Sequence, residues 1–251
     1  MISLDRVFNY QLNSSSIISL TTWSSISFVC LCDACIRHIF TQEELQHFFE
    51  TCDAIEYRYS YQSLGQVCAA LFRLLYGCGL RINEALSLKC EDVNLTDGFI
   101  VIHETKNGEE RKLPLSKSLI TVLRQYYSHY RSNANGQDYF FVKRNGMKCS
   151  SDTIYRKFRK MLYHANISHG GKGHGPRVYD FRHSFSVHSL ANMAEQGLDL
   201  YYCLPLLSKY LGHKSLSATD SYVRLTAEMY PKLINDVNQI CAFIFPEVKQ
   251  Q

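Results

Sequence analysis

The sequence predicts a mainly α-helical fold that carries one small antiparallel β-sheet. Apolar side chains recur every three or four residues through most of the chain after residue 40, which is the period of an amphipathic helix. The period changes to two over residues 99–103 and 111–115, and these segments flank Asn107-Gly108, a pair typical of hairpin turns. Helices therefore form the body of the predicted fold, and the hairpin forms its sheet.

The first helix is predicted over residues 41–55. It opens on Thr41-Gln-Glu-Glu44, which has the form of a capping box, and apolar residues follow at helical spacing. A second helix over about 63–76 stops at Gly77-Cys78-Gly79, and a third begins at Ile82. Further helices are expected over residues 116–130, 152–165, 181–194, 203–211 and 216–236.

Residues 39–236 are predicted to form one domain, because no Pro- or Gly-rich linker interrupts them. Residues 1–38 include a stretch without charge between Arg6 and Asp33, which invites a signal-peptide or membrane interpretation. That stretch has many polar side chains and no apolar run of about 18 residues, so we expect a disordered or truncated leader. Residues 237–251 form an apolar tail.

Composition places the chain among soluble globular proteins. It has 251 residues, 46% hydrophobic and 20% charged, with a mean hydropathy of −0.18, so a membrane bundle is not expected. The ten cysteines are scattered, and we expect them to be reduced, mostly buried and cytoplasmic. Cys32-Asp-Ala-Cys35 lacks the second ligand pair of a zinc site, so we expect neither a metal site nor a cofactor.

Basic residues are concentrated between Lys143 and Arg182, a stretch that contains ten Lys and Arg residues and only two acidic residues. This stretch is a candidate phosphate-contacting surface, although charges of this kind also simply solvate a helix face. The candidate DNA-contacting residues are Lys143, Arg144, Arg156, Lys157, Lys160, Lys172 and Arg177.

Four short motifs follow one another along the chain. They are Gly79-Leu-Arg81-Ile-Asn-Glu84-Ala-Leu, then Thr105-Lys106-Asn-Gly, then Tyr179-Asp-Phe-Arg182-His183, and finally Leu211-Gly-His213 with Tyr222 nine residues later. Each motif alone is weak, but their joint order and spacing are specific. From about residue 39 to 232 the chain resembles the catalytic domain of tyrosine recombinases, the phage integrase family.

The resemblance implies a DNA strand-transfer site. Tyr222 would attack a scissile phosphate, release a 5′-hydroxyl and form a 3′-phosphotyrosine. Arg81 and Arg182 would hold the non-bridging oxygens, since guanidinium groups match that geometry and stay protonated. Lys106 would protonate the leaving 5′ oxygen, and His213 would donate to the phosphate or position Tyr222.

Two more residues are expected to support this site. Glu84, three residues after Arg81, would hold an active-site base or arginine in place, and His183 is the neighbour of Arg182. The two arginines, the lysine and the histidine supply the positive charge that a metal supplies in other phosphoryl-transfer sites.

The chain departs from the family pattern at Tyr179, where the family usually has His or Lys. A phenol keeps its proton near neutral pH, so Tyr179 can donate a hydrogen bond but is a poor general base. His174 and His183 are near enough in sequence to substitute in part, although such histidines more often hold a loop.

The ends of the chain depart from the pattern as well. Full-length members resemble a two-domain clamp, and residues 1–38 are too short for the core-binding domain, so we expect weak DNA binding at moderate salt. In the family the terminal helix docks on a neighbouring protomer. Here the apolar tail either does so or folds back on its own domain.

The resemblance predicts site-specific DNA recombination in the cytoplasm, serving integration, excision or transposition of a mobile element. The expected partners are double-stranded DNA and further copies of the chain in a tetramer. One alternative is a truncated, inactive remnant that only binds DNA. Another is a type IB topoisomerase-like enzyme, which shares the chemistry but acts without sequence choice.

Overall fold

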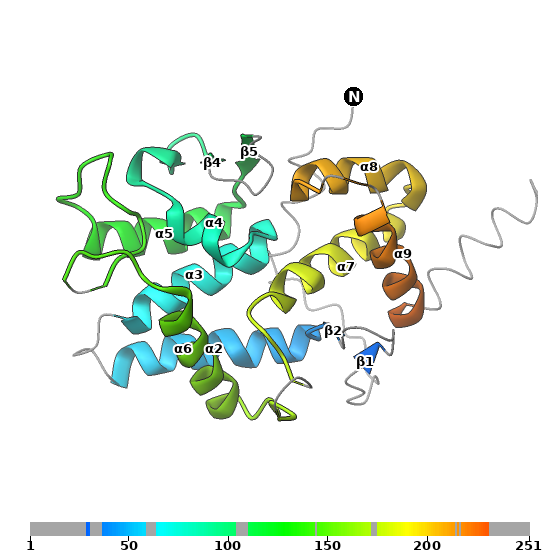
Figure 1. Cartoon of the computed structure of the whole chain (residues 1–251), viewed down its shortest axis with the longest axis horizontal. Helices are drawn as coiled ribbons and strands as arrows, with labels where there is room; N and C mark the ends of the chain where they lie inside the picture. Colours follow the sequence, from blue (N-terminus) through cyan, green and yellow to red (C-terminus); the bar gives the residue numbers. More distant parts are fainter. Residues whose placement is uncertain are drawn as a thin grey trace, which may run out of the picture. The chain divides into compact units, whose positions relative to one another are not determined.

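The structure is a computed structural model that describes residues 29–30, 37–58, 64–103, 110–143, 145–171, 175–213, 215 and 217–230. The chain divides into two compact units, Met1–Phe185 and Ser186–Gln251. Figure 1 labels the helices α2 to α9 and the strands β1, β2, β4 and β5.

Helices form most of the part of the first unit that the structure describes (Figure 1). They are α2 (Gln42–Arg58), α3 (Leu64–Cys78), α4 (Ile82–Ser87), α5 (Lys117–Tyr130), α6 (Ser151–His164) and the first turns of α7 (Asp180–Glu195). Helix α3 packs against α2, α5 and α6, and α2 also packs against α6. Because each of these helices has an apolar face, their packing removes those faces from water and forms the core.

The centre of this core is aromatic. Phe40 stacks on Phe181 with ring centroids 5.1 Å apart, and Phe48, Phe72 and Phe158 surround the pair. All five side chains are fully buried. Offset and edge-to-face aromatic pairs add about 0.5–1.5 kcal/mol each beyond their buried area. The start of α7, which carries Phe181, is therefore anchored in the core.

A three-stranded sheet of the first unit has the strand order β3-β4-β5 and is antiparallel. Its strands are β3 (Val93–Asn94), β4 (Phe99–Ile102) and β5 (Arg111–Pro114), and a short 3-10 helix, η2 (Cys90–Asp92), precedes β3. Ile100 pairs with Leu113, and both are buried. A separate two-stranded pairing joins β1 (Val29–Cys30) to β2 (Arg37–His38).

The second unit holds the rest of α7, α8 (Leu200–Leu211) and α9 (Ser217–Met229), and α8 packs against α9. Helix α8 starts at Leu200 rather than at residue 203 as predicted, because the Asp199 carboxylate caps it by accepting the N–H of Tyr201 at 2.8 Å. It ends at Gly212, whose φ of 68° lies in the left-handed region that glycine tolerates.

The predicted fold class is confirmed: the described residues are mainly helical with a three-stranded antiparallel sheet. The predicted capping box of the first helix is present, since Glu44 N–H donates to Thr41 Oγ1 at 3.1 Å and Thr41 N–H donates to Glu44 Oε2 at 2.9 Å. The leader through residue 28, the hairpin turn 104–109 and the tail from residue 231 lie outside the described residues. The predicted domain bounds, 39–236, stay a prediction.

Among the described residues, no helix combines the length and the apolar character that crossing a membrane requires. Six cysteines, Cys52, Cys68, Cys78, Cys90, Cys149 and Cys203, are free thiols. Burial raises the pKa of the Cys68 thiol to about 12 and that of Cys149 to about 11. Cys32 and Cys35 lie outside the described residues.

Candidate active site

Arg81 lies at the junction between two helices of the first unit. Helix α3 stops at Gly79, which has a φ of 59°, and Arg81 is the N-cap of α4 with extended backbone angles. The Gly79-Leu80-Arg81 motif is therefore a helix stop followed by a helix start. This turn fixes the direction in which the Arg81 side chain leaves the backbone.

Glu84 holds Arg81 from both its backbone and its side chain. Its Oε2 accepts the Arg81 N–H at 2.9 Å, and its Oε1 accepts from Arg81 Nη1 at 2.7 Å. Glu84 is itself buried. The side chain that the sequence assigned a supporting role thus contacts Arg81 directly.

Arg111 is a third arginine in this cluster, and the sequence prediction did not include it. It lies on β5 and reaches Glu84 with both terminal nitrogens, Nη2 to Oε2 at 2.7 Å and Nη1 to Oε1 at 3.2 Å. In sequence Arg111 is one position of an alternating strand, and Glu84 is 27 residues away. Only the folded chain shows the contact.

Arg182 occupies the first turn of α7 and is fully buried. Its Nη1 donates to the carbonyl oxygen of Gly79 at 2.7 Å. Since Gly79 begins the turn that presents Arg81, the two arginines of the predicted site meet at the same turn. Burying a guanidinium costs free energy, which favours a functional reason for its position.

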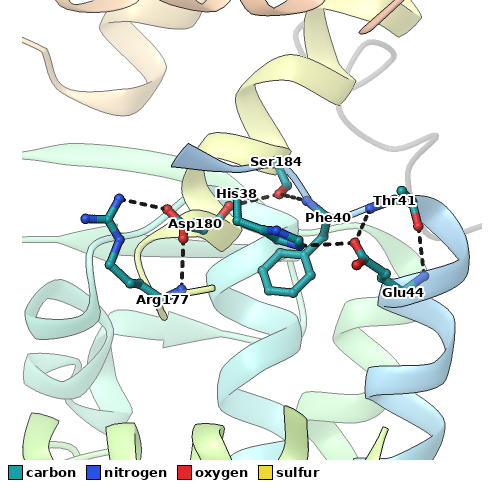
Figure 2. Close-up of polar contacts among 7 residues, drawn as sticks. All are labelled: His38, Phe40, Thr41, Glu44, Arg177, Asp180 and Ser184. Atoms are coloured by element: carbon teal, nitrogen blue, oxygen red, sulfur yellow. Dashed lines mark hydrogen bonds and ion pairs between the residues drawn. The ribbon is translucent and has the colours of Figure 1, made fainter. Parts of the chain in front are cut away.

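The start of α7 is held by a set of polar contacts that Figure 2 shows. Asp180 accepts the Arg177 N–H at 2.8 Å, and its other oxygen lies 3.4 Å from Arg177 Nη2. Burial raises the pKa of Asp180, and the contacts from Arg177 offset part of that rise. Asp180 therefore closes the turn that leads into Arg182.

Ser184 ties the segment before α2 to this turn (Figure 2). Its hydroxyl donates to the Asp180 carbonyl at 2.9 Å and accepts the Phe40 N–H at 2.9 Å. Beside it, His38 Nε2 lies 3.1 Å from Glu44 Oε2. The chain that precedes α2 is thereby fastened to the helix that carries Arg182.

Tyr179 and His183 flank Arg182. The Tyr179 ring is exposed and meets the His183 ring edge-on with centroids 4.9 Å apart. His183 is buried, and its Nε2 lies 3.9 Å from Asp180 Oδ1. Tyr179 is thus placed at the surface beside Arg182. His174, the other histidine considered at this position, lies outside the described residues.

His213 follows the end of α8 in the second unit. The Gly212 N–H donates to Lys209 O at 3.1 Å and the His213 N–H donates to Ser208 O at 3.0 Å, which is the pattern of a Schellman motif. The Leu211-Gly212-His213 motif is therefore the C-terminal stop of α8. It places His213 at the entrance to the connection with α9.

Tyr222 lies on α9 beside His213. Their rings are nearly parallel, with an interplanar angle of 14° and centroids 6.2 Å apart. Tyr222 is 2% exposed. His213 Nδ1 is 2.7 Å from the hydroxyl of Thr219, a fully buried residue of the same helix that the sequence prediction did not include.

The structure brings the predicted residues together in two groups. The first unit joins Arg81, Glu84 and Arg182 around the Gly79 turn, with Tyr179 and His183 beside Arg182. The second unit joins His213 and Tyr222. Lys106 lies outside the described residues, so its role stays a prediction.

Three of the seven candidate DNA-contacting residues lie on α6. Arg156 and Lys160 are exposed there, Lys157 is half-buried, and Arg156 pairs with Asp152 at 2.5 Å. Lys143 is half-buried and Arg177 contacts Asp180 as described. Arg144 and Lys172 lie outside the described residues.

Several known proteins are similar to this chain. A putative integrase/recombinase, y4rB, of Sinorhizobium fredii is 30% identical over 196 residues, which cover 76% of this chain and 62% of that protein. The tyrosine recombinase XerA of Pyrococcus furiosus is 32% identical over 170 residues, 66% of this chain and 52% of that protein. The chain therefore spans between half and two thirds of the length of these relatives.

Solved structures share the fold. A crystal structure of the XerH site-specific recombinase bound to a palindromic difH substrate has a TM-score of 0.60 at 23% identity, covering 77% of this chain and 51% of that one. A lambda integrase tetramer bound to a Holliday junction has a TM-score of 0.53 at 17% identity, covering 73% and 47%.

The sequence model of the phage integrase family matches residues 38–229, which include the described site residues and the position of Lys106. This match covers more than half of the chain. The chain belongs to the phage integrase family, the family of tyrosine recombinases.

Proposed function

We propose that this chain cleaves and rejoins DNA at specific sites through a covalent 3′-phosphotyrosine on Tyr222, and that it serves the movement of a mobile element. One observation carries the proposal. Arg182, a fully buried cation, donates to the carbonyl of Gly79, so the guanidinium of one arginine holds the turn that presents the guanidinium of the other, Arg81. Two such groups suit the two non-bridging oxygens of a phosphate.

The proposed step is a transesterification. The Tyr222 oxygen forms a bond to phosphorus as the bond from phosphorus to the 5′ oxygen breaks. The phenol loses one proton and the 5′ oxygen gains one, for which Lys106 is the predicted donor. Arg81 and Arg182 stabilise the negative charge of the five-coordinate phosphate, and His213 orients the Tyr222 ring or donates to the same phosphate.

The proposed partners are double-stranded DNA and further copies of the chain. The exposed basic residues of α6 are suited to contact phosphates, whatever the base sequence. The DNA-bound XerH and lambda integrase structures support this proposal, because those proteins share the fold and the latter is a tetramer on a Holliday junction. We propose that the chain acts in the cytoplasm, where such DNA is accessible.

The test begins with a search for the DNA site. A pool of duplexes with a randomised central segment is incubated with the 251-residue chain, denatured in SDS, and sequenced after capture of protein-linked DNA. Enriched sequences are then rebuilt with a nick beside the cleavage position, so that the released fragment diffuses away and the adduct accumulates. We expect an SDS-stable adduct with the wild type and none with Tyr222→Phe.

Two other outcomes would replace the proposal. DNA binding that weakens with salt but yields no adduct on any sequence would show a non-catalytic remnant. Relaxation of supercoiled plasmid without sequence enrichment would show a topoisomerase-like activity instead.

A further inference from the structure

Glu84 is shared between two arginines, and this arrangement sets the charge of the site. Each of the two donates to it at 2.7 Å, Arg81 from the N-terminus of α4 and Arg111 from β5. Burial opposes ionisation of Glu84, but the hydrogen bonds and positive charges of Arg111 and Arg81 hold the pKa of its carboxyl below the usual value. The carboxylate is therefore negatively charged at neutral pH.

The charge balance explains why a second arginine is needed. An ionised Glu84 paired with Arg81 alone would be a neutral pair, and a neutral pair attracts a phosphate poorly. With Arg111 the cluster carries a net charge of one positive unit. Arg111 also occupies one edge of the carboxylate, so Glu84 cannot turn both oxygens to the guanidinium of Arg81.

The exposed fraction of the side chain decreases from Arg81 to Arg111 to Glu84. Arg81 is 22% exposed, Arg111 11% and Glu84 3%. Arg81 is thus the outer cation, and Arg111 is the inner one. Arg111 Nε is buried without an acceptor among the described residues, and buried ion pairs contribute little net stability. A gain in folding free energy therefore does not account for Arg111.

We propose that Arg111 is a positioning residue for Arg81 and acts through Glu84. It holds the carboxylate in the orientation that leaves Arg81 directed outward and keeps the cluster cationic. This inference rests on the proposed function for its catalytic consequence, because Arg81 must bind the scissile phosphate. The positioning of Arg81 itself can be measured without any DNA.

The first experiment observes Arg81 in the free protein. Arginine side-chain NMR of ¹⁵N-labelled chain reports whether rotation of the Arg81 guanidinium is slowed by its contact with Glu84. We expect the resolved Arg81 signals of the wild type to shift and broaden in Arg111→Met, and to return in part in Arg111→Lys. Unchanged Arg81 signals in Arg111→Met would overturn the proposal, whether or not the chain cleaves DNA.

Arg131→Met is the matched control. Arg131 is also 11% exposed, lies 3.7 Å from the carboxylate of Asp138, and has a buried Nε without an acceptor among the described residues. Arg131→Met therefore removes an arginine that is as buried as Arg111 and lies elsewhere in the same unit. We expect it to leave the Arg81 signals unchanged, and an equal effect of both substitutions would reduce Arg111 to a general structural role.

The second experiment asks which part of the reaction depends on Arg111. On the DNA site found by the pool selection, Arg111→Met should slow adduct formation by about 10- to 100-fold, the effect seen when a residue that orients a metal ligand is lost from a metal site. A methylphosphonate at the scissile position removes the charge that Arg81 stabilises. The wild type and Arg111→Met should then differ by no more than about threefold.

A substrate with sulfur in place of the 5′-bridging oxygen tests the other possible defect, loss of leaving-group protonation. A thiolate leaves without a proton donor, so it relieves defects in protonation of the leaving group and not defects in charge stabilisation. The deficit of Arg111→Met should persist on this substrate. Relief by the bridging sulfur rather than by the methylphosphonate would overturn the proposal, whereas a wild type without any adduct would overturn only the proposed function.

Discussion

His213 Nδ1 and Thr219 Oγ1 lie 2.7 Å apart, six residues from one another in sequence. The contact joins the end of α8 to the first turn of α9, the helix that carries Tyr222. A histidine ring turns about its side-chain bonds unless it is held, so this contact limits the planes that His213 presents to Tyr222. The two rings are nearly parallel.

Replacing Thr219 should therefore slow cleavage. Thr219→Val keeps the branched shape and removes the hydroxyl. Loss of the hydrogen bond that orients His213 should raise the activation free energy by about 1 kcal/mol, which slows adduct formation by about fivefold to tenfold. Thr226→Val is the control, because Thr226 is equally buried on α9 but donates to the Tyr222 carbonyl. Equal adduct rates for the two variants at matched stability would refute a role for Thr219 in orienting His213.

Ser184→Ala should destabilise the first unit. The substitution leaves the buried Phe40 N–H without the hydroxyl that accepts it, and an unsatisfied buried donor costs about 1–3 kcal/mol. Urea unfolding measures the loss, and hydrogen exchange at the Phe40 amide should accelerate. Ser128→Ala, on the exposed side of α5, should change neither quantity. Unchanged exchange at Phe40 would contradict the contact.

The stabilising effect of Glu84 should depend on pH with a defined sign. The pKa of its carboxyl is lowered in the folded chain, so its contribution is complete above the usual pKa of a glutamate and is lost as the pH falls through the lowered value. Glu84→Gln should lower the free energy of unfolding by about 3 kcal/mol at neutral pH, since it leaves two arginines without a carboxylate.

Urea unfolding of the wild type and Glu84→Gln at decreasing pH checks this sign. The difference between the two proteins should shrink as the solution becomes acidic. A constant or growing difference would be inconsistent with an ionised Glu84 in the cluster. Glu91→Gln, at an exposed position, provides the control.

Lys160→Ala should weaken DNA binding without regard to sequence. Lys160 is exposed on α6, and a single phosphate contact contributes about one unit to the slope of log affinity against log salt. Fluorescence anisotropy with random-sequence duplex measures this slope. Lys117→Ala, an exposed lysine on α5, should leave the slope unchanged. If both variants keep the wild-type slope, Lys160 does not contact a phosphate.

The sequence was sufficient to predict most helices because each has an apolar face with a clear period. The helix predicted over 41–55 is α2, and the hairpin predicted around 99–115 is β4 and β5. The strand β3 was not predicted, since two residues carry no period. The start of α8 depends on the Asp199 cap, which an apolar pattern alone does not reveal.

The site residues that the sequence did not indicate are those defined by distant contacts. Arg111 reads as one position of an alternating strand, and its fork on Glu84 exists only once β5 lies beside α4. Thr219 reads as an ordinary polar residue at a helix start. The motif residues could be predicted because a catalytic motif fixes spacing along the chain, whereas residues that orient them are fixed only in space.

A covalent bond between Tyr222 and DNA gives the peptide that contains Tyr222 a defined increase in mass. After digestion of the trapped adduct with trypsin and a nuclease, we expect one nucleotide on the peptide that contains Tyr222, and no modified peptide from Tyr222→Phe. A nucleotide on a different tyrosine, or an adduct that persists in Tyr222→Phe, would show that Tyr222 is not the nucleophile.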